Sequence, residues 1–136
     1  MKLLMFDTNE FWYKTFSKTI ESAETCDKEE RTEDSLVVFI NVEAADEGNR
    51  DKVIKRAADH ISWLAKKTNR HKVILHFFAH LSESKSSVEF SKMALGAIRE
   101  KLNSKGFEAS TTPFGYFLEF QIHVKGESLA KVWKSI

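Results

Sequence analysis

Two short segments carry the side chains and turns best suited to hold a ligand. They are Phe77–Ser82 and Pro113–Phe117, and each adjoins an apolar run typical of a β-strand. Backbone amides and short side chains at strand ends can face a ligand. Pro113 is the only proline of the chain, and Gly115 follows closely, which indicates a tight corner defined by the backbone. These two segments are therefore the first candidates for a binding site.

The histidines and the single cysteine supply the other reactive groups. His76 and His80 are four residues apart, which pairs zinc ligands on a helix, but on a strand this spacing only places both on one face. With no cysteine or carboxylate at ligand spacing nearby, we expect no metal site. Cys26 lies in a charged stretch without a neighbouring histidine, which is typical of a surface cysteine. The alternative is a catalytic thiol whose partners are near only in space. Glu119 and His123 lie on the same face of a predicted strand. They are either an acid–base pair or part of the solvent-facing polar side of that strand.

Composition narrows the class of protein. The chain has 136 residues with 42% hydrophobic content, which fits one domain, residues 1–136, around one core. Its net charge of +1 indicates no broad basic surface for binding long nucleic acid. Contact with only the last nucleotides of an RNA would not require such a surface. One cysteine excludes an internal disulfide. No signal peptide or membrane-spanning run is present, so we expect a soluble cytoplasmic protein.

Strands and helices alternate along the chain. Apolar or alternating runs predict five strands, over Lys2–Phe6, Ser35–Val42, Lys72–Ala79, Phe107–Thr112 and Tyr116–Val124. Helical spacing predicts three helices, over Arg50–Thr68, from Ser86 or Ser87 to Gly106, and over Glu127–Lys134. Glu10–Ile20 fits helix and strand equally, Thr25–Asp34 reads as a charged connection, and Ala45–Asn49 as a loop. This order predicts an α/β domain with helices packed on a β-sheet.

The same segments resemble the N-terminal editing domain of archaeal-type threonyl-tRNA synthetases. Ala79-His80-Leu81-Ser82 and Pro113-Phe114-Gly115-Tyr116 are the most specific matches. The strand Leu36–Glu43, the acidic loop after it and Lys125-Gly126 follow in the expected order, so the resemblance covers nearly the whole chain. It implies a layered α/β fold like that of the D-aminoacyl-tRNA deacylases.

The resemblance implies hydrolysis of seryl-tRNA(Thr) that the threonine enzyme makes in error. Serine lacks one methyl group of threonine, and a single pocket gains only about 1–3 kcal/mol from such a difference. A second, smaller pocket supplies the missing discrimination. The implied partners are the 3′ end of tRNA(Thr) carrying serine, a threonyl-tRNA synthetase catalytic body and a second copy of the chain in a homodimer. No cofactor and no membrane partner are expected.

The resemblance also implies where the amino acid binds. It places the site between the exit of the strand Lys72–Ala79 and the proline corner. The substrate-binding residues carried over are Ala79, His80, Pro113, Phe114, Gly115, Tyr116 and Phe117. After the corner the family has Tyr-Tyr-Lys, whereas this chain has Tyr116-Phe117-Leu118, so Leu118 replaces the lysine assigned to the attacking water. A family glutamate corresponds to Lys131, which leaves Lys131 and His80 as the candidate catalytic side chains.

Two functions of different classes remain open. The first is an editing hydrolase with weakened or rewired catalysis, in which Lys131 supplies the missing ammonium. The second is a non-catalytic domain of the same fold that binds a tRNA 3′ end or associates with a synthetase. Fold does not decide between them. Release of free serine from mischarged tRNA is the observation that does.

Overall fold

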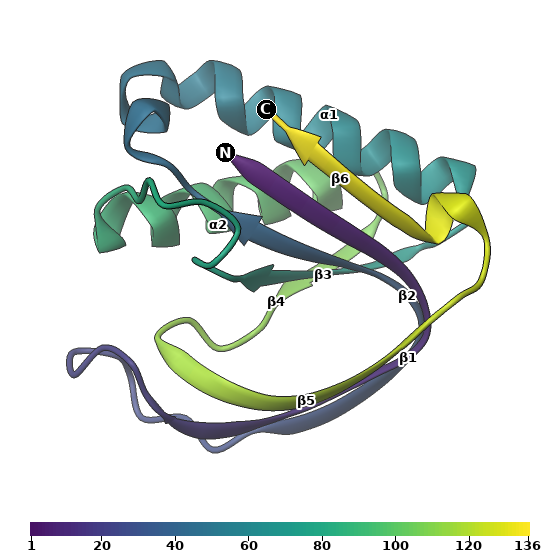
Figure 1. Cartoon of the computed structure of the whole chain (residues 1–136), viewed down its shortest axis with the longest axis horizontal. Helices are drawn as coiled ribbons and strands as arrows, with labels where there is room; N and C mark the ends of the chain where they lie inside the picture. Colours follow the sequence, from purple (N-terminus) through teal and green to yellow (C-terminus); the bar gives the residue numbers. More distant parts are fainter.

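A computed structural model describes all 136 residues, which form a curled six-stranded sheet with two helices on one face (Figure 1). The strands are β1 (Lys2–Lys18), β2 (Glu29–Asn41), β3 (Lys72–Phe77), β4 (Glu108–Thr111), β5 (Tyr116–Val124) and β6 (Lys131–Ser135). The helices are α1 (Arg50–Lys67) and α2 (Val88–Ser104), with short 3-10 turns η1 (Ala44–Asn49) and η2 (Ser128–Ala130).

The sheet order is β4-β3-β2-β1-β5, and β6 also pairs with β1. β2, β3 and β4 run parallel, whereas β1 is antiparallel to its three partners. β1 is long enough to pair with two strands, one after the other, along the same edge. Its first residues, Lys2–Phe6, pair with β6, and the stretch from Thr8 to Lys18 pairs with β5. The long strand therefore carries the curl of the sheet from its helix-covered part to β5.

Several predicted elements are confirmed at close to their predicted bounds. β5 has the expected limits, and α1 ends one residue before the predicted end. Ser87 is the N-cap of α2, where its hydroxyl oxygen accepts a hydrogen bond from the backbone N–H of Phe90 at 3.2 Å. β3 ends at Phe77, two residues earlier than predicted, so Ala79 and His80 lie in the turn that follows.

Two segments of the first hairpin are strand where the sequence was ambiguous or misleading. Most of Glu10–Ile20 forms a strand and not a helix, because β1 continues to Lys18. The prediction of a charged connection over Thr25–Asp34 is wrong from Glu29 onward, where β2 begins. Cross-strand contacts explain this result, since the indole N–H of Trp12 donates to Glu29 at 2.7 Å.

The predicted helix over Glu127–Lys134 is wrong. This segment forms η2 and then β6, so Lys131 begins a strand and lies opposite Phe6. Eight residues are too few for a helix to be stable by its own propensity. The open edge of β1 offers hydrogen bonds to this segment instead, and the branched Val132 and aromatic Trp133 suit a strand.

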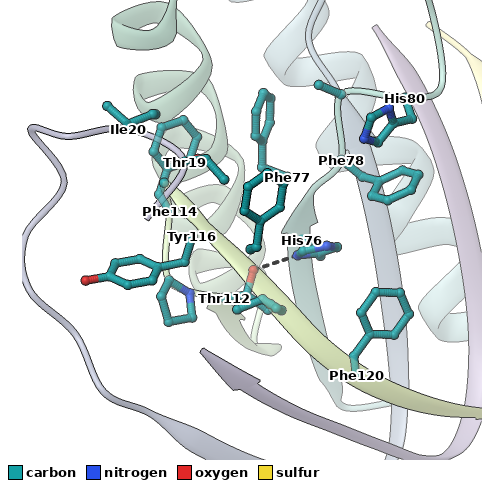
Figure 2. Close-up of a pocket in the computed structure, with 15 residues that line it drawn as sticks. Thr19, Ile20, His76, Phe77, Phe78, His80, Thr112, Phe114, Tyr116 and Phe120 are labelled. Atoms are coloured by element: carbon teal, nitrogen blue, oxygen red, sulfur yellow. Dashed lines mark hydrogen bonds between the residues drawn. The ribbon is translucent and has the colours of Figure 1, made fainter. Parts of the chain in front are cut away.

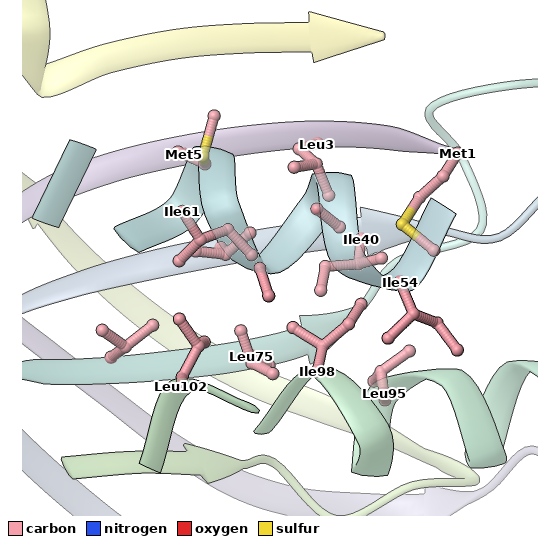
Figure 3. Close-up of a cluster of buried hydrophobic side chains, with 14 of the residues drawn as sticks. Met1, Leu3, Met5, Ile40, Ile54, Ile61, Leu75, Leu95, Ile98 and Leu102 are labelled. Atoms are coloured by element: carbon pink, nitrogen blue, oxygen red, sulfur yellow. The ribbon is translucent and has the colours of Figure 1, made fainter. Parts of the chain in front are cut away.

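The face under the helices holds the main core, which we call the helix-side core (Figure 3). It contains 20 buried residues, all apolar, from the first three strands and both helices. Alternation along β2 directs Leu36, Val38 and Ile40 to this core. Val37 and Phe39 point to the opposite face, where they form an aromatic cluster with Phe11, Tyr13 and Ile74.

Candidate functional site

A cavity of about 220 Å³ opens between the exit of β3 and the corner that precedes β5 (Figure 2). Nine of its 15 lining residues are hydrophobic, so the walls are mostly apolar. The lining consists of Thr19, Ile20, His76, Phe77, Phe78, Ala79, His80, Thr112, Pro113, Phe114, Gly115, Tyr116, Phe117, Leu118 and Phe120. All seven residues predicted to bind substrate border this one cavity.

Sheet topology brings the two segments together. Parallel strands end at the same edge of a sheet, and in open α/β sheets this edge is where ligands bind. β3 and β4 are parallel neighbours, so the turn after Phe77 and the chain after Thr111 leave the sheet side by side. The backbone N–H of Thr112 still donates to the carbonyl of Leu75 at 3.0 Å, which fixes the start of the corner.

The corner depends on Gly115. Its φ of +84° is a conformation that favours glycine, and an added Cβ would lie 2.8 Å from the Cβ of Ala23. The carbonyl of Gly115 accepts a hydrogen bond from the backbone N–H of Thr19 at 2.8 Å. The corner is thus held against the far end of β1, which closes one side of the cavity.

Tyr116 contributes its ring to the cavity but not its hydroxyl. In Figure 2 the hydroxyl points away from His76. It accepts a hydrogen bond from the backbone N–H of Cys26 at 2.7 Å and donates one to the carbonyl of Glu24 at 3.0 Å. The phenol therefore fixes the loop between β1 and β2.

His76 and Thr112 form a polar pair on the cavity wall. Nδ1 of His76 lies 2.9 Å from Oγ1 of Thr112, and the two residues are only 7% and 5% exposed. The imidazole packs against aromatic rings, the nearest being Phe39 with ring centres 5.0 Å apart. Burial lowers the pKa of His76 to about 4, so its ring is neutral near pH 7. No group of three metal-ligating side chains is present.

Residues 1–136 match the model of one family, the Archaea-specific editing domain of threonyl-tRNA synthetase. The chain belongs to this family. The threonine–tRNA ligase of Thermococcus kodakarensis is 32% identical over 139 residues, and that of Methanoregula boonei 32% identical over 136. Each match covers 100% of this chain and 22% of the relative, so the editing domain spans about a fifth of the length of these relatives.

A solved structure shows the same fold at low identity. The editing domain aligns with a chain described as c-Myc DNA Unwinding Element Binding Protein, with a TM-score of 0.72 and 8% identity, covering 100% of the domain and 99% of that chain. This likeness concerns the fold alone. The expected α/β fold, with helices packed on a β-sheet, is confirmed. Neither helix of the domain is both long and apolar enough to span a bilayer.

His80 lies exposed at the rim of the cavity. Its ring packs against Phe78, with ring centres 5.1 Å apart. Ser82, two residues further on, donates to Glu43 at 2.8 Å. Burial alone would raise the pKa of Glu43, but hydrogen bonds from the N-terminal amino group, Ser82 and Lys2 outweigh it and hold that pKa at about 2. The loop carrying His80 is therefore anchored to an ionised carboxylate.

On β5 the residues alternate as the sequence predicts. Leu118 lines the cavity and packs against the aromatic cluster. Phe117 is on the other face of the strand, and its side chain is 58% exposed. An apolar side chain thus stands in the cavity at the position where the resemblance led us to expect a lysine.

The structure does not bring Lys131 into this cavity. Lys131 starts β6 and is absent from the lining, and its Nζ lies 3.5 Å from the carbonyl of Glu127. Conversely, sequence reasoning missed Thr112 as a cavity residue and gave His76 no positive role. The one available signal was the position of Thr112 next to Pro113, since the residue before proline is held extended at a corner.

Proposed function

We propose that this editing domain binds the 3′ end of seryl-tRNA(Thr) in the cavity and hydrolyses the seryl ester with weakened catalysis. The observation that carries this proposal is the cavity itself, which is lined by both segments on which the family resemblance rests. The implied partners are the tRNA and a threonyl-tRNA synthetase catalytic body. The amino acid would enter between the β3 turn and the Pro113–Tyr116 corner.

The walls of the cavity favour a small amino acid. The tilted rings of Phe77 and Phe114 contact each other on the wall, with ring centres 5.1 Å apart, and Phe120 closes the side toward the aromatic cluster. We infer that these rigid rings limit the space beside the seryl side chain, because pressing an added methyl group against them would be unfavourable. Exclusion of threonine by size is the selection that an editing pocket needs.

Weakened catalysis follows from the side chains present. His80 is the only exposed imidazole in the lining, and we assign it to positioning the attacking water at the rim. Leu118 offers neither a charge nor a hydrogen bond to that water. The water adds to the ester carbonyl, and the ribose oxygen leaves with a proton, giving free serine and intact tRNA.

A non-catalytic domain that binds a tRNA 3′ end is the second candidate. The apolar Leu118 and the neutral His76 favour it, because neither supplies the charge that hydrolysis of an ester uses. In this case the cavity would bind the aminoacyl end without releasing serine.

Serine release separates the two candidates. The domain is mixed with seryl-tRNA(Thr), and free serine is measured over time, with threonyl-tRNA(Thr) as the matched control. The editing hydrolase is supported if seryl-tRNA(Thr), but not threonyl-tRNA(Thr), is hydrolysed faster than background and if His80→Ala lowers that rate. Binding of seryl-tRNA(Thr) without release supports the non-catalytic domain. A requirement for Lys131, tested with Lys131→Ala, would instead favour the rewired mechanism.

Leu118→Lys should raise the rate of serine release, because it places an ammonium inside the cavity. A positioned group of this kind contributes a factor of roughly 10²–10⁴. Leu118→Met is the matched control, since it adds length without charge. Desolvation will lower the pKa of the new lysine, so rates are measured up to alkaline pH and folding is checked by circular dichroism. A folded Leu118→Lys variant that is no faster than Leu118→Met would show that the family geometry does not apply here.

We also propose that the domain forms a homodimer. Large aromatic side chains remain uncovered, with Phe16 at 79%, Phe117 at 58% and Trp133 at 57% exposure. Phe16 and Phe117 are on the paired strands β1 and β5, and neighbouring exposed apolar side chains are typical of an interaction site. Light scattering at micromolar concentration should give twice the monomer mass, and the monomer mass would refute this assembly.

A further inference from the structure

The cavity contains one buried polar pair in an otherwise apolar wall. Of its polar side chains, Thr19 and His80 are exposed, and the hydroxyl of Tyr116 is already bonded to the loop between β1 and β2. Only His76 and Thr112 are both buried and on the wall. Figure 2 shows them bonded to each other between the rings of Phe77 and Phe120.

This pair can both donate and accept toward a ligand. When Nδ1 of His76 carries no proton, the hydroxyl of Thr112 donates to it, and the lone pairs of Oγ1 remain to accept from a ligand. When Nδ1 carries the proton, Nδ1 donates to Oγ1, and the hydroxyl hydrogen is available to donate. A ligand hydroxyl also does both, so a hydroxyl is the group that fits either arrangement.

We propose that the His76–Thr112 pair binds the side-chain hydroxyl of the aminoacyl group, so that the cavity selects hydroxyl-bearing over plain aliphatic amino acids. This inference rests on the proposed function. The lowered pKa of His76 agrees with it, because a neutral imidazole does not repel the α-ammonium of the same ligand.

Anchoring the hydroxyl also sharpens rejection of threonine. A free threonyl side chain could rotate and place its methyl group where the seryl hydroxyl lies. At a buried polar pair this rotation leaves Thr112 or His76 without its ligand partner, which is unfavourable. The methyl group must then point at the aromatic walls. Size exclusion and hydroxyl binding therefore act together.

The test uses binding, so it does not depend on catalysis. Amide-linked, non-hydrolysable analogues of 3′-seryl-adenosine and 3′-alanyl-adenosine are titrated into the parent chain by calorimetry. The seryl analogue should bind about tenfold more tightly, as expected for one neutral hydrogen bond. Thr112→Val, which keeps the shape and loses the hydroxyl, should bring the two affinities together. Thr112→Ser, which keeps the hydroxyl, should restore the preference.

Each outcome decides the inference. Equal affinity of the parent for both analogues, or a seryl preference that persists in folded Thr112→Val, overturns hydroxyl selection and leaves the proposed function standing. Binding of neither analogue overturns the proposed function as well. If Thr112→Val does not fold, Thr112→Ala, which also removes the hydroxyl, takes its place and must abolish the preference.

Discussion

On the face of the sheet that α1 and α2 cover, 20 buried residues pack without a polar partner among them. The opposite face holds only five buried cluster residues, beside a cavity of about 220 Å³. Both faces are built from the same strands, since alternation along β2 and β3 supplies each in turn. The difference lies in what covers them, two full helices on one side and the single curled strand β5 on the other. The helix-covered face provides stability, and the partly covered face leaves space for a ligand.

The largest expected effect tests this contrast directly. Leu75 is fully buried in the helix-side core, so Leu75→Ala should lower the free energy of unfolding by about 2–5 kcal/mol. Leu118→Ala, the same change on the cavity wall, should lower it by only about 1 kcal/mol, because that side chain already borders empty space. Urea unfolding measures both. Equal losses would mean that the cavity wall is as tightly packed as the core.

His76 on the cavity wall and Glu43, which anchors the loop carrying His80, should affect stability in different pH windows. His76 has a pKa of about 4 in the folded chain against 6.5 when unfolded, so the unfolded state binds more protons between these values. The contribution of His76 to the free energy of unfolding is fully present above pH 6.5. It falls by about 3 kcal/mol in all as pH drops toward 4. The pKa of Glu43 is lowered from 4.5 to about 2, so the stability that Glu43 contributes is lost only as pH falls from about 4.5 to about 2.

His76→Phe separates these contributions. It should flatten the pH dependence of stability between pH 6.5 and 4 while leaving the loss at lower pH. His60 also has a lowered pKa, through burial first and Lys134 second, so a smaller slope should remain. Thermal unfolding across pH measures the slope. An unchanged slope in the variant would place the titrating group elsewhere.

A comparison of two glycines tests the corner of the cavity. Gly106 and Gly115 both have positive φ, but only at Gly115 does an added Cβ approach another atom, the Cβ of Ala23 at 2.8 Å. Gly106→Ala should cost about 1 kcal/mol from backbone strain alone. Gly115→Ala should cost about 1–2 kcal/mol more, because the corner must also shift. Equal costs in urea unfolding would show that the loop carrying Ala23 yields freely.

Local sequence patterns predicted the elements in which many consecutive residues indicate the same secondary structure. The alternation of β5, the stripe of α1 and the Ser87 cap of α2 each follow from side chains close in sequence. Prediction failed where a partner strand decided the outcome. Glu29–Asp34 is polar enough for a loop, and Glu127–Lys134 is short enough to be helix or strand, but both lie along edges of β1 that offer hydrogen bonds.

By itself, the sequence predicted that Phe77–Ser82 and Pro113–Phe117 lie at strand ends and could face a ligand, because strand ends and a proline–glycine corner are local features. It also determined that Leu118 points to the same face as Ile122, through the period of the strand. Only the tertiary structure decided that His76 meets Thr112, 36 residues away, and that Lys131 is directed elsewhere. Such pairings depend on strand order and curl, which arise from long-range packing and leave no periodic signal in the chain.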